Sequence, residues 1–263
     1  MTTWPGWLGR LSPARRRLHL VVAGLLAAVL VTLVVRSVGD PAAGAPAPVD
    51  QARRGPVLLV PGYGGSTAAL EDLAAALPDA EVVVPPGDGT GDLRAAAEGL
   101  ADRVAAALDR TGAGSVDLVG YSAGGVVVRY YVAELGGDAV TRRVATIASP
   151  HHGTDLAALA TSLGDGACAE ACRQLDPDSD LLRGLNQGDE TPAGPRWLSL
   201  WTETDRTVVP PDSAVLEGAT SIDLQDTCRT GPLSHGEIVR DPRTIGIVES
   251  FLAGDADGFA LAC

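Results

Sequence analysis

From residue 55 onward, short apolar runs rich in β-branched residues alternate with longer stretches rich in alanine and leucine. The short runs are apolar at almost every position, which is typical of strands buried on both faces of a sheet. The longer stretches have the length and composition of helices. We expect strands at 56–60, 81–84, 116–120, 143–149, 196–202 and 219–224, and helices at 67–77, 92–112, 123–137, 154–164 and 241–252.

This alternation predicts a mostly parallel central sheet of about six strands, with helices on both of its faces. Residues 55–263 are expected to form this α/β domain as one unit, because the alternation is uninterrupted and the segment is long enough to bury a sizeable core. Asp92 can cap the N-terminus of the second predicted helix, and Gly112 can end that helix in the left-handed conformation. Ligands of such sheets bind at the carboxyl ends of the strands, so residues just after strands are the first candidates for a site.

The first 54 residues have a different character. The apolar run from Leu18 to Val35 would form a helix about 27 Å long, close to the ~30 Å hydrocarbon core of a membrane. Four arginines precede this run within residues 1–17 and only Arg36 follows it directly, which predicts that residues 1–17 stay in the cytoplasm and the body of the chain is exported. Residues 18–36 are therefore either a transmembrane anchor or the apolar part of a cleaved signal peptide. Residues 37–54 have the proline, alanine and glycine content of a linker.

The chain is acidic, with a formal net charge of −13. Loss of residues 1–45 would change this charge from −13 to −17, because five arginines and one aspartate would be removed. A surface of this charge repels nucleic acid and anionic membrane faces, so we expect no nucleic-acid partner. We expect a monomer, either secreted or attached to the membrane through an uncleaved N-terminal helix, with its catalytic domain outside the cytoplasm.

The four cysteines, Cys168, Cys172, Cys228 and Cys263, all lie in the part of the chain that is expected outside the cytoplasm. An oxidising compartment permits disulfides there. A bridge between Cys168 and Cys172 would stabilise by about 2 kcal/mol and one between Cys228 and Cys263 by about 4 kcal/mol, from loop entropy. We expect these two bridges, although four cysteines allow three pairings. The alternative of a zinc site is disfavoured, because "CAEAC" lacks a second close pair of cysteines and the histidines lie elsewhere.

A serine stands between two glycines where the third predicted strand meets the next helix. Gly120, Tyr121, Ser122 and Gly124 belong to this G-x-S-x-G sequence. The turn has to be sharp, so the serine must adopt a backbone conformation that costs ~1–3 kcal/mol, and neither glycine position has room for a side chain. Such a turn lifts the hydroxyl above the edge of the sheet and points the N-terminus of the next helix at it. Ser122 is therefore the expected nucleophile.

This setting resembles the α/β-hydrolase fold, in which the nucleophile, the acid and the histidine follow in that order along the chain. His235 is the only histidine after the late strands, and it directly precedes the last helix, so it is the expected general base. Glu203, Asp205 and Asp212 are the candidates for the acid. Asp205 is chosen because "DRTVVP" resembles the acid turn of these hydrolases. The resemblance thus implies a catalytic triad of Ser122, Asp205 and His235.

The oxyanion of a tetrahedral intermediate needs two preorganised donors. The resemblance implies that these are the backbone amides of Ala123 and Tyr63, the latter in the glycine-rich loop "VPGYGGS" after the first strand. This loop is similar to the His-Gly-x-Gly-Gly loop of small secreted bacterial lipases, with Pro61 in place of their histidine. Gly62 and Gly64 are expected to let the loop lie flat against the site.

A second similarity to the same lipases follows the fourth predicted strand. The sequence "IASPHHGTDLA" is similar to their Pro-His-x-Gly-Thr segment, which implies that His151 and His152 support the pocket through hydrogen bonds. A metal pair formed with Asp155 is the alternative role for these histidines. "LLRGLNQGDETP" and "CAEAC" look like segments of actinobacterial relatives, so the resemblance covers roughly residues 55–252.

These features predict an exported serine hydrolase of the lipase or carboxylesterase type, acting on acylglycerols or simple acyl esters through an acyl-enzyme and without a metal or other cofactor. One alternative is an acyltransferase or deacylase of envelope lipids with the same triad, and another is an inactive binding module with this fold. Apolar candidates beside the site are Tyr63, Tyr121 and the leucine-rich stretches 156–163 and 181–185. The body is too short for a large cap domain, so we expect an open or lightly covered cleft.

Overall fold

The computed structural model describes residues 49–84, 86–164, 167–229 and 231–254, together with the isolated positions 15, 19, 22 and 24. Contacts divide the chain into two units, Met1–Ala47 and Pro48–Cys263, and every element below belongs to the second. The predicted regions 1–17 and 18–36 and most of the linker lie outside the described residues, apart from those four positions. In the described part of the chain, no helix combines the length and the apolar character that crossing a membrane requires.

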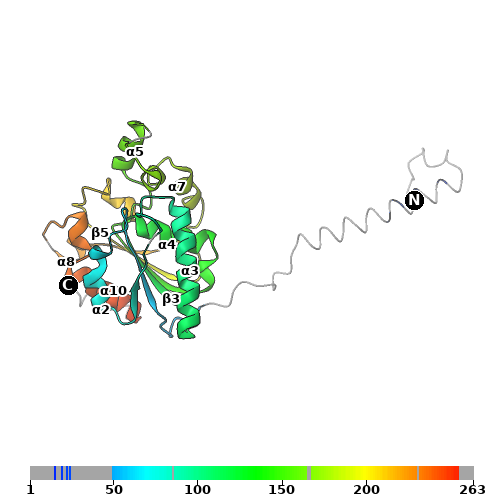
Figure 1. Cartoon of the computed structure of the whole chain (residues 1–263), viewed down its shortest axis with the longest axis horizontal. Coiled ribbons are helices and arrows are strands. Elements are labelled where there is room, and N and C mark those ends of the chain that lie inside the picture. The colour runs from blue at the N-terminus through cyan, green and yellow to red at the C-terminus, as the bar shows by residue number, and fades with distance from the viewer. Residues whose placement is uncertain are drawn as a thin grey trace, which may run out of the picture. The chain divides into compact units, whose positions relative to one another are not determined.

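The strands of the described chain form one sheet in the order β2-β1-β3-β4-β5-β6, with every neighbouring pair parallel (Figure 1). The bounds are Val57–Val60 for β1, Ala80–Val82 for β2, Val116–Tyr121 for β3, Thr141–Ile147 for β4, Arg196–Trp201 for β5 and Thr220–Asp223 for β6. The prediction of a mostly parallel, six-stranded sheet is confirmed. β1, β3 and β4 are buried at every position, as central strands covered on both faces must be.

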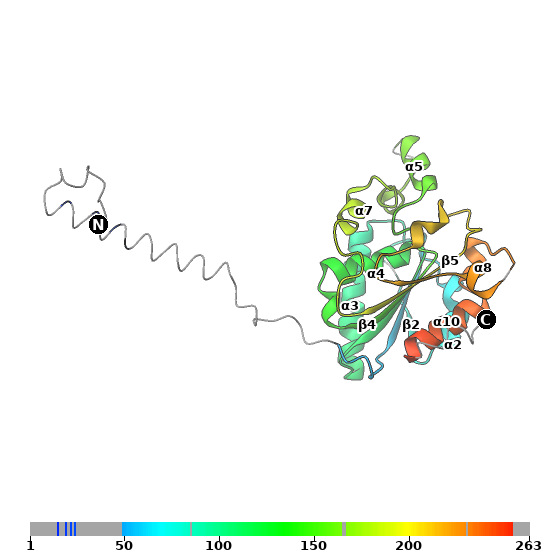
Figure 2. The ribbon, with the colours of Figure 1, turned by 180° about the vertical axis from the view of Figure 1, so that it is seen from behind.

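Helices cover both faces of this sheet, as predicted. Figures 1 and 2 show α3 and α4 on one side and α2 and α10 on the other. The elements outside the segment between β4 and β5 are η2 Thr67–Leu70, α2 Glu71–Ala76, α3 Leu93–Thr111, α4 Ala123–Glu134, η3 Gly137–Ala139, η4 Pro211–Ala214, α8 Leu224–Cys228, α9 His235–Ile238 and α10 Pro242–Ala253.

Each face has its own apolar core, because successive strand residues point to opposite faces. On one face, Leu100 of α3 and Val126 of α4 belong to the same cluster as Leu118 of β3. On the opposite face of the sheet, Leu73 of α2 and Ile247 of α10 belong to a second apolar cluster. The two clusters hold the sheet rigidly between helices, which fixes where the carboxyl ends of its strands lie.

One residue at each end determines where α3 begins and ends, as the sequence predicted. The Asp92 carboxylate accepts a hydrogen bond from the Arg94 amide at 2.8 Å and so satisfies one of the unpaired donors of the first turn. Gly112 ends the helix at φ 66°, a conformation that glycine adopts without a Cβ penalty. Both capping predictions are confirmed.

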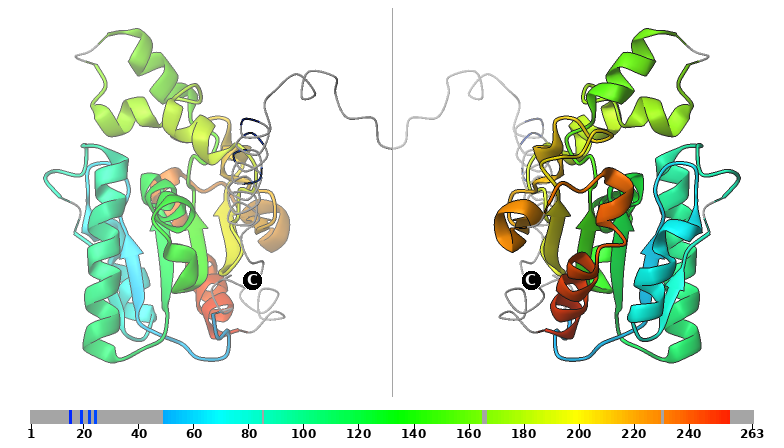
Figure 3. Two further views of the ribbon diagram at one scale, coloured as in Figure 1. Left: turned by 90° about the vertical axis from the view of Figure 1, so that its right-hand side faces the viewer. Right: turned by 90° about the vertical axis from the view of Figure 1, so that its left-hand side faces the viewer.

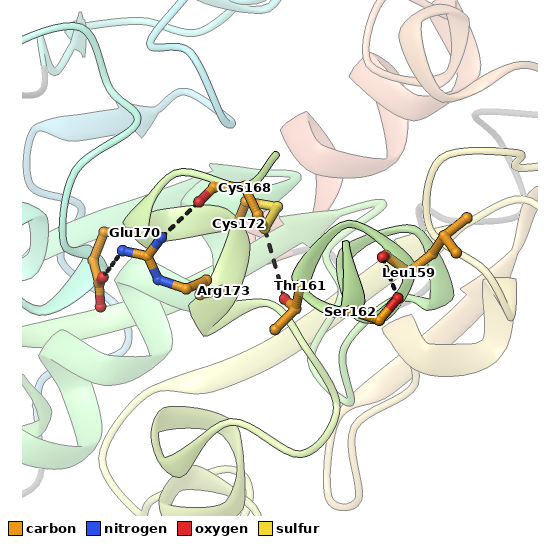
Figure 4. Close-up of a disulfide and its surroundings, with 7 residues drawn as sticks. All are labelled: Leu159, Thr161, Ser162, Cys168, Glu170, Cys172 and Arg173. Carbon is orange, nitrogen blue, oxygen red and sulfur yellow. Dashed lines mark hydrogen bonds and ion pairs between the residues drawn. A yellow bond between two sulfur atoms is a disulfide. The ribbon is translucent and has the colours of Figure 1, made fainter. Parts of the chain in front are cut away.

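An insertion, residues 148–195, connects β4 to β5 and carries three helices, α5 Asp155–Ser162, α6 Glu170–Gln174 and α7 Asp180–Leu185. Figure 3 shows its helices beyond the carboxyl end of the sheet. A disulfide joins Cys168 to Cys172 at the start of α6 (Figure 4). The Cys168 sulfur lies 3.7 Å from Thr161 Oγ1 of α5. The insertion is therefore a small helical segment with an internal covalent link, and the lightly covered cleft stays a prediction.

The two leucine-rich stretches of the insertion have different environments. Leu156, Leu159 and Leu163 are 49%, 59% and 72% exposed. The leucines of 181–185 are instead buried in the core cluster that α7 shares with α4. The prediction that 181–185 lines a pocket is wrong for these leucines, because α7 packs with its apolar side against the body of the domain.

The cysteine predictions are confirmed as far as the described residues reach. Cys168 and Cys172 form the predicted short bridge. Cys228, the last residue of α8, is also disulfide-bonded. Its expected partner, Cys263, lies outside the described residues. A bridge at the end of α8 fixes this short helix, which precedes the segment that carries His235.

Candidate active site

Ser122 lies in the turn between β3 and α4, at the carboxyl end of the sheet. Its backbone has φ 54° and ψ −129°, a region that costs a residue other than glycine ~1–3 kcal/mol. The Ser122 amide donates to the Ile147 carbonyl of β4 at 2.8 Å, which anchors the turn to the neighbouring strand. The strained turn predicted from G-x-S-x-G is therefore present.

The two glycines of the motif are required by close packing around this turn. A Cβ added to Gly120 would lie 2.5 Å from the Gly125 Cα. A Cβ added to Gly124 would lie 2.3 Å from the Val60 carbonyl oxygen. Both distances are far below van der Waals contact, so any side chain would push α4 away from the sheet and displace Ser122.

The structure brings Ser122, His235 and Asp205 into one hydrogen-bonded chain. His235 Nε2 lies 2.9 Å from Ser122 Oγ, and His235 Nδ1 lies 2.7 Å from Asp205 Oδ2. With Nδ1–H donating to the carboxylate, Nε2 of the neutral imidazole is the acceptor for the serine hydroxyl. This is the arrangement of nucleophile, base and orienting acid that activates a hydroxyl group.

Asp205 is held in place by its own turn. It is 4% exposed, and its Oδ1 accepts hydrogen bonds from the amides of Thr207 at 2.7 Å and Val208 at 3.0 Å. Its Oδ2 is thereby left to face His235. The other two acid candidates, Glu203 and Asp212, are exposed.

Tyr121, which precedes the serine, contacts the histidine as well. Its hydroxyl donates to the His235 carbonyl at 3.1 Å, and the two ring centroids are 5.2 Å apart. Burial, with the charge of Asp205 adding to it, raises the pKa of Tyr121 to about 12. The phenol therefore stays neutral and remains a donor, which helps to hold the histidine backbone beside the serine.

A second group of polar side chains connects the acid turn to the histidine segment. Thr204 Oγ1 donates to the Leu233 carbonyl at 2.8 Å and accepts from the Leu233 amide at 3.0 Å. The Gln225 amide group of α8 donates to Thr202 Oγ1 at 2.6 Å and to Thr204 Oγ1 at 3.0 Å. Sequence analysis missed Gln225 and Thr204, because hydrogen bonds across 21 to 29 positions leave no local pattern.

The two expected oxyanion donors belong to the loop after β1 and to the first residue of α4. Gly62 approaches so closely that an added Cβ would lie 2.8 Å from Ser122 Cβ, so the loop that leads to Tyr63 lies against the serine. The Gly64 amide donates to the Gly89 carbonyl at 3.0 Å and fixes the loop. Among the described residues, no protein acceptor receives a hydrogen bond from the amide of Tyr63 or from that of Ala123, the first residue of α4. The Tyr63 side chain itself is 47% exposed.

His151 and His152 lie next to each other but have different surroundings. His151 is fully buried and its Nε2 lies 3.1 Å from Thr146 Oγ1. Burial, together with the positive charge of Arg129, lowers the pKa of His151 well below its ordinary value of 6.5. The His152 ring lies 3.2 Å from the Ser213 carbonyl and 2.7 Å from Glu190. Both histidines make hydrogen bonds around the insertion, and the described residues contain no cluster suited to a metal ion.

Comparisons with known proteins agree with the fold described above. Residues 55–166 match the family model described as alpha/beta hydrolase fold. The mature form of the lipase BlEst2 from Bacillus licheniformis is 20% identical with a TM-score of 0.63, over 81% of this chain and 96% of that one. Aspergillus fumigatus lipase B is 20% identical with a TM-score of 0.64, over 85% of this chain and 59% of the lipase. No curated protein sequence matches the chain significantly. The chain has the α/β-hydrolase fold, as its sequence suggested.

Proposed function

We propose that this chain is a serine hydrolase of the lipase or carboxylesterase type. The observation that carries the proposal is the hydrogen-bonded chain from Ser122 through His235 to Asp205, set on a strained turn at the carboxyl end of the sheet. A buried carboxylate, a correctly oriented imidazole and an accessible hydroxyl group together form a nucleophile, whereas each alone is a common structural feature.

In the proposed reaction, Ser122 Oγ attacks the ester carbonyl carbon while His235 Nε2 accepts the hydroxyl proton. Asp205 keeps the imidazole in the required tautomer and stabilises its cation. The same proton then passes from Nε2 to the alkoxide oxygen as the carbon–oxygen bond of the ester breaks, and the alcohol leaves. Water, deprotonated by His235, attacks the resulting acyl-enzyme and releases the carboxylic acid and the free serine.

The negative charge on the carbonyl oxygen would be stabilised by the amides of Tyr63 and Ala123. Both are fixed before the substrate arrives, so they need no reorganisation during the reaction. The N-terminus of α4, a helix of 12 residues, adds its partial positive charge at the same point. Removal of one such donor typically lowers kcat by roughly 10²–10³-fold.

The proposed substrates are esters of apolar acids, including acylglycerols. Leu156, Leu159 and Leu163 expose apolar surface on the insertion. The helices of the insertion lie beyond the carboxyl end of the sheet (Figure 3), and Ser122 directly follows β3 at that end. The similar structures named above are lipases. The disulfides fit an oxidising compartment, so we propose that the enzyme acts outside the cytoplasm, released or anchored through residues 18–36.

The proposal is tested with a fluorophosphonate probe, which reacts covalently with an activated serine. We expect the wild-type protein to be labelled at Ser122, and Ser122→Ala to lose both labelling and about 10⁶-fold in kcat. Ser162→Ala, at an exposed serine of α5, is the matched control and should keep both. Labelling or ester hydrolysis that survives in Ser122→Ala would refute the proposal. Comparison of water with added alcohols as acyl acceptors then separates a hydrolase from an acyltransferase.

A further inference from the structure

A mostly apolar pocket of about 300 Å³ lies beside the loop that carries the expected oxyanion donor. Its walls come from four parts of the chain: the end of β1 and the two residues after it (60–62), residues 83, 84, 86, 87, 89 and 91 after β2, the first half of α3, and the start of α4. The reaction steps proposed above give this pocket no role. Its position beside the reacting carbonyl group and its apolar walls indicate which part of the substrate it binds.

The pocket begins next to the position of the reacting carbonyl group. Gly62 and Ala123 both line it. Ala123 carries one of the proposed oxyanion donors, and a Cβ added to Gly62 would lie 3.4 Å from Ser122 Oγ. Gly62 therefore both lines the pocket and lies against Ser122, so an acyl group bonded to Ser122 Oγ lies directly beside the pocket.

The order of the strands decides which part of an ester lies on this side. The pocket adjoins β1 and β2, whereas Asp205 and His235 follow β5 and β6, on the opposite side of β3. His235 must deliver a proton to the oxygen of the leaving alcohol, so the alcohol has to lie on the histidine side. The acyl chain is then directed toward the pocket.

The walls suit a hydrocarbon chain. Val60, Val83, Leu93 and Val127 supply apolar side chains. Among the described lining residues, Asp92 is the one charged group, and its carboxylate is already bonded to the Arg94 amide and to Gln174 Nε2 at 2.7 Å. A volume of about 300 Å³ is at the lower end of ligand pockets, which favours a short or medium acyl chain over a long one.

Gly99 keeps this pocket open. It lies within α3, where glycine is less favourable than alanine, so the helix itself gains nothing from it. A Cβ added there would meet no atom closer than Pro86 Cδ at 3.8 Å, which shows that space remains in front of it. Ala95, one helical turn earlier, lines the same space with a methyl group.

We propose that this pocket binds the acyl chain of the substrate and that Gly99 and Ala95 set the chain length that the enzyme accepts. The inference rests on the proposed function. It names the pocket, the part of the ester that enters it and the residues that select among esters, none of which the triad determines.

The test compares butanoyl, octanoyl and hexadecanoyl esters of one alcohol. We expect the wild type to have its highest kcat/KM on the octanoyl ester. Gly99→Leu should lower kcat/KM for the octanoyl ester on the order of 10-fold or more and change that for the butanoyl ester less than about twofold, because only the longer chain reaches the filled space. Ala106→Leu, an exposed position of α3 outside the pocket, is the matched control and should leave the ratio unchanged.

Ala95→Leu provides a second variant if Gly99→Leu does not fold, since Ala95 is exposed at the rim of the pocket. A folded Gly99→Leu or Ala95→Leu protein with the wild-type chain-length ratio would overturn the inference. Impaired turnover only of esters with a long alcohol part would overturn it too, since the pocket would then hold the alcohol. A wild type that neither hydrolyses esters nor reacts with the fluorophosphonate would refute the proposed function instead.

Discussion

The sheet with its site and the insertion above it are built in opposite ways. Around Ser122, the side chains of Ser122, His235 and Asp205 are hydrogen-bonded in one chain, and β3 beneath them is buried on both faces. In the insertion, Leu156 and Leu159 of α5 and Leu163 directly after it are exposed, and a disulfide between residues four positions apart holds the neighbouring turn. The difference suggests a division of labour. We expect the sheet to determine the proposed reaction and the insertion to determine whether dispersed or soluble esters reach it.

After the loss expected for Ser122→Ala, the next largest effect is expected at Asp205, the acid of the proposed triad. Asp205→Asn keeps the shape of the side chain but favours the wrong tautomer of His235, so we expect kcat to fall about 10⁴-fold on soluble and dispersed esters alike. Steady-state kinetics on both forms of substrate measure this. Asp212→Asn and Glu203→Gln change exposed carboxylates and should have little effect. If Glu203→Gln caused the large loss and Asp205→Asn did not, the assignment of the acid would be wrong.

A smaller effect is expected at Gln225. Gln225→Leu removes the donor that ties Thr202 and Thr204 together behind the histidine segment, so His235 should be less well oriented. We expect kcat to fall on the order of 10-fold with KM little changed, because positioning acts on the reacting groups. The pH dependence of kcat should change as well, which a purely structural role would not produce. Gln187→Leu, at an exposed glutamine of the insertion, serves as the control.

His151 gives the sheet a pH-dependent stability. Its pKa is well below 6.5 in the folded protein, so below about pH 6.5 the unfolded chain binds a proton that the folded one does not. The free energy of unfolding should therefore decrease as the pH falls through this range, by up to about 1.4 kcal/mol per pH unit from this group. Denaturant titrations between pH 7 and pH 5 should show a weaker pH dependence for His151→Gln. A His151→Gln protein that keeps the wild-type pH dependence would show that another group causes it.

The smallest expected change in turnover follows from replacing the exposed leucines of α5 and of the residue after it. This change is also the most direct test of what the insertion does. Replacing Leu159 and Leu163 with aspartate should reduce turnover of an emulsified acylglycerol several-fold, because exposed apolar area favours contact with a lipid surface. Turnover of a soluble short-chain ester should be unchanged. Leu135→Asp, at an exposed leucine after α4, is the control for added charge. If turnover of the emulsified and the soluble ester fell equally, the insertion would not act on the physical form of the substrate, and the proposed division of roles between the sheet and the insertion would be wrong.

Much of the sheet could be predicted because its signals are local. Apolar runs marked all six strands, Asp92 and Gly112 marked the ends of α3, and the two glycines around Ser122 marked a turn that no other residue permits. The short helices α6, α7, α8 and α9 were not predicted as helices. Helices of four to six residues are too short to be stable alone, so packing and not propensity forms them.

The sequence by itself determined the order of strands and helices, the position of the strained serine and a small set of carboxylates and histidines that could serve it. Only the tertiary structure decided which carboxylate faces His235 and which leucines of the insertion are buried. It also decided that Gln225, Thr204 and the pocket lined by Gly99 lie near the site. The physical reason is the range of the interactions. Backbone geometry and periodic burial are set by neighbours along the chain, whereas hydrogen bonds and cavities depend on segments that meet only after the sheet has formed.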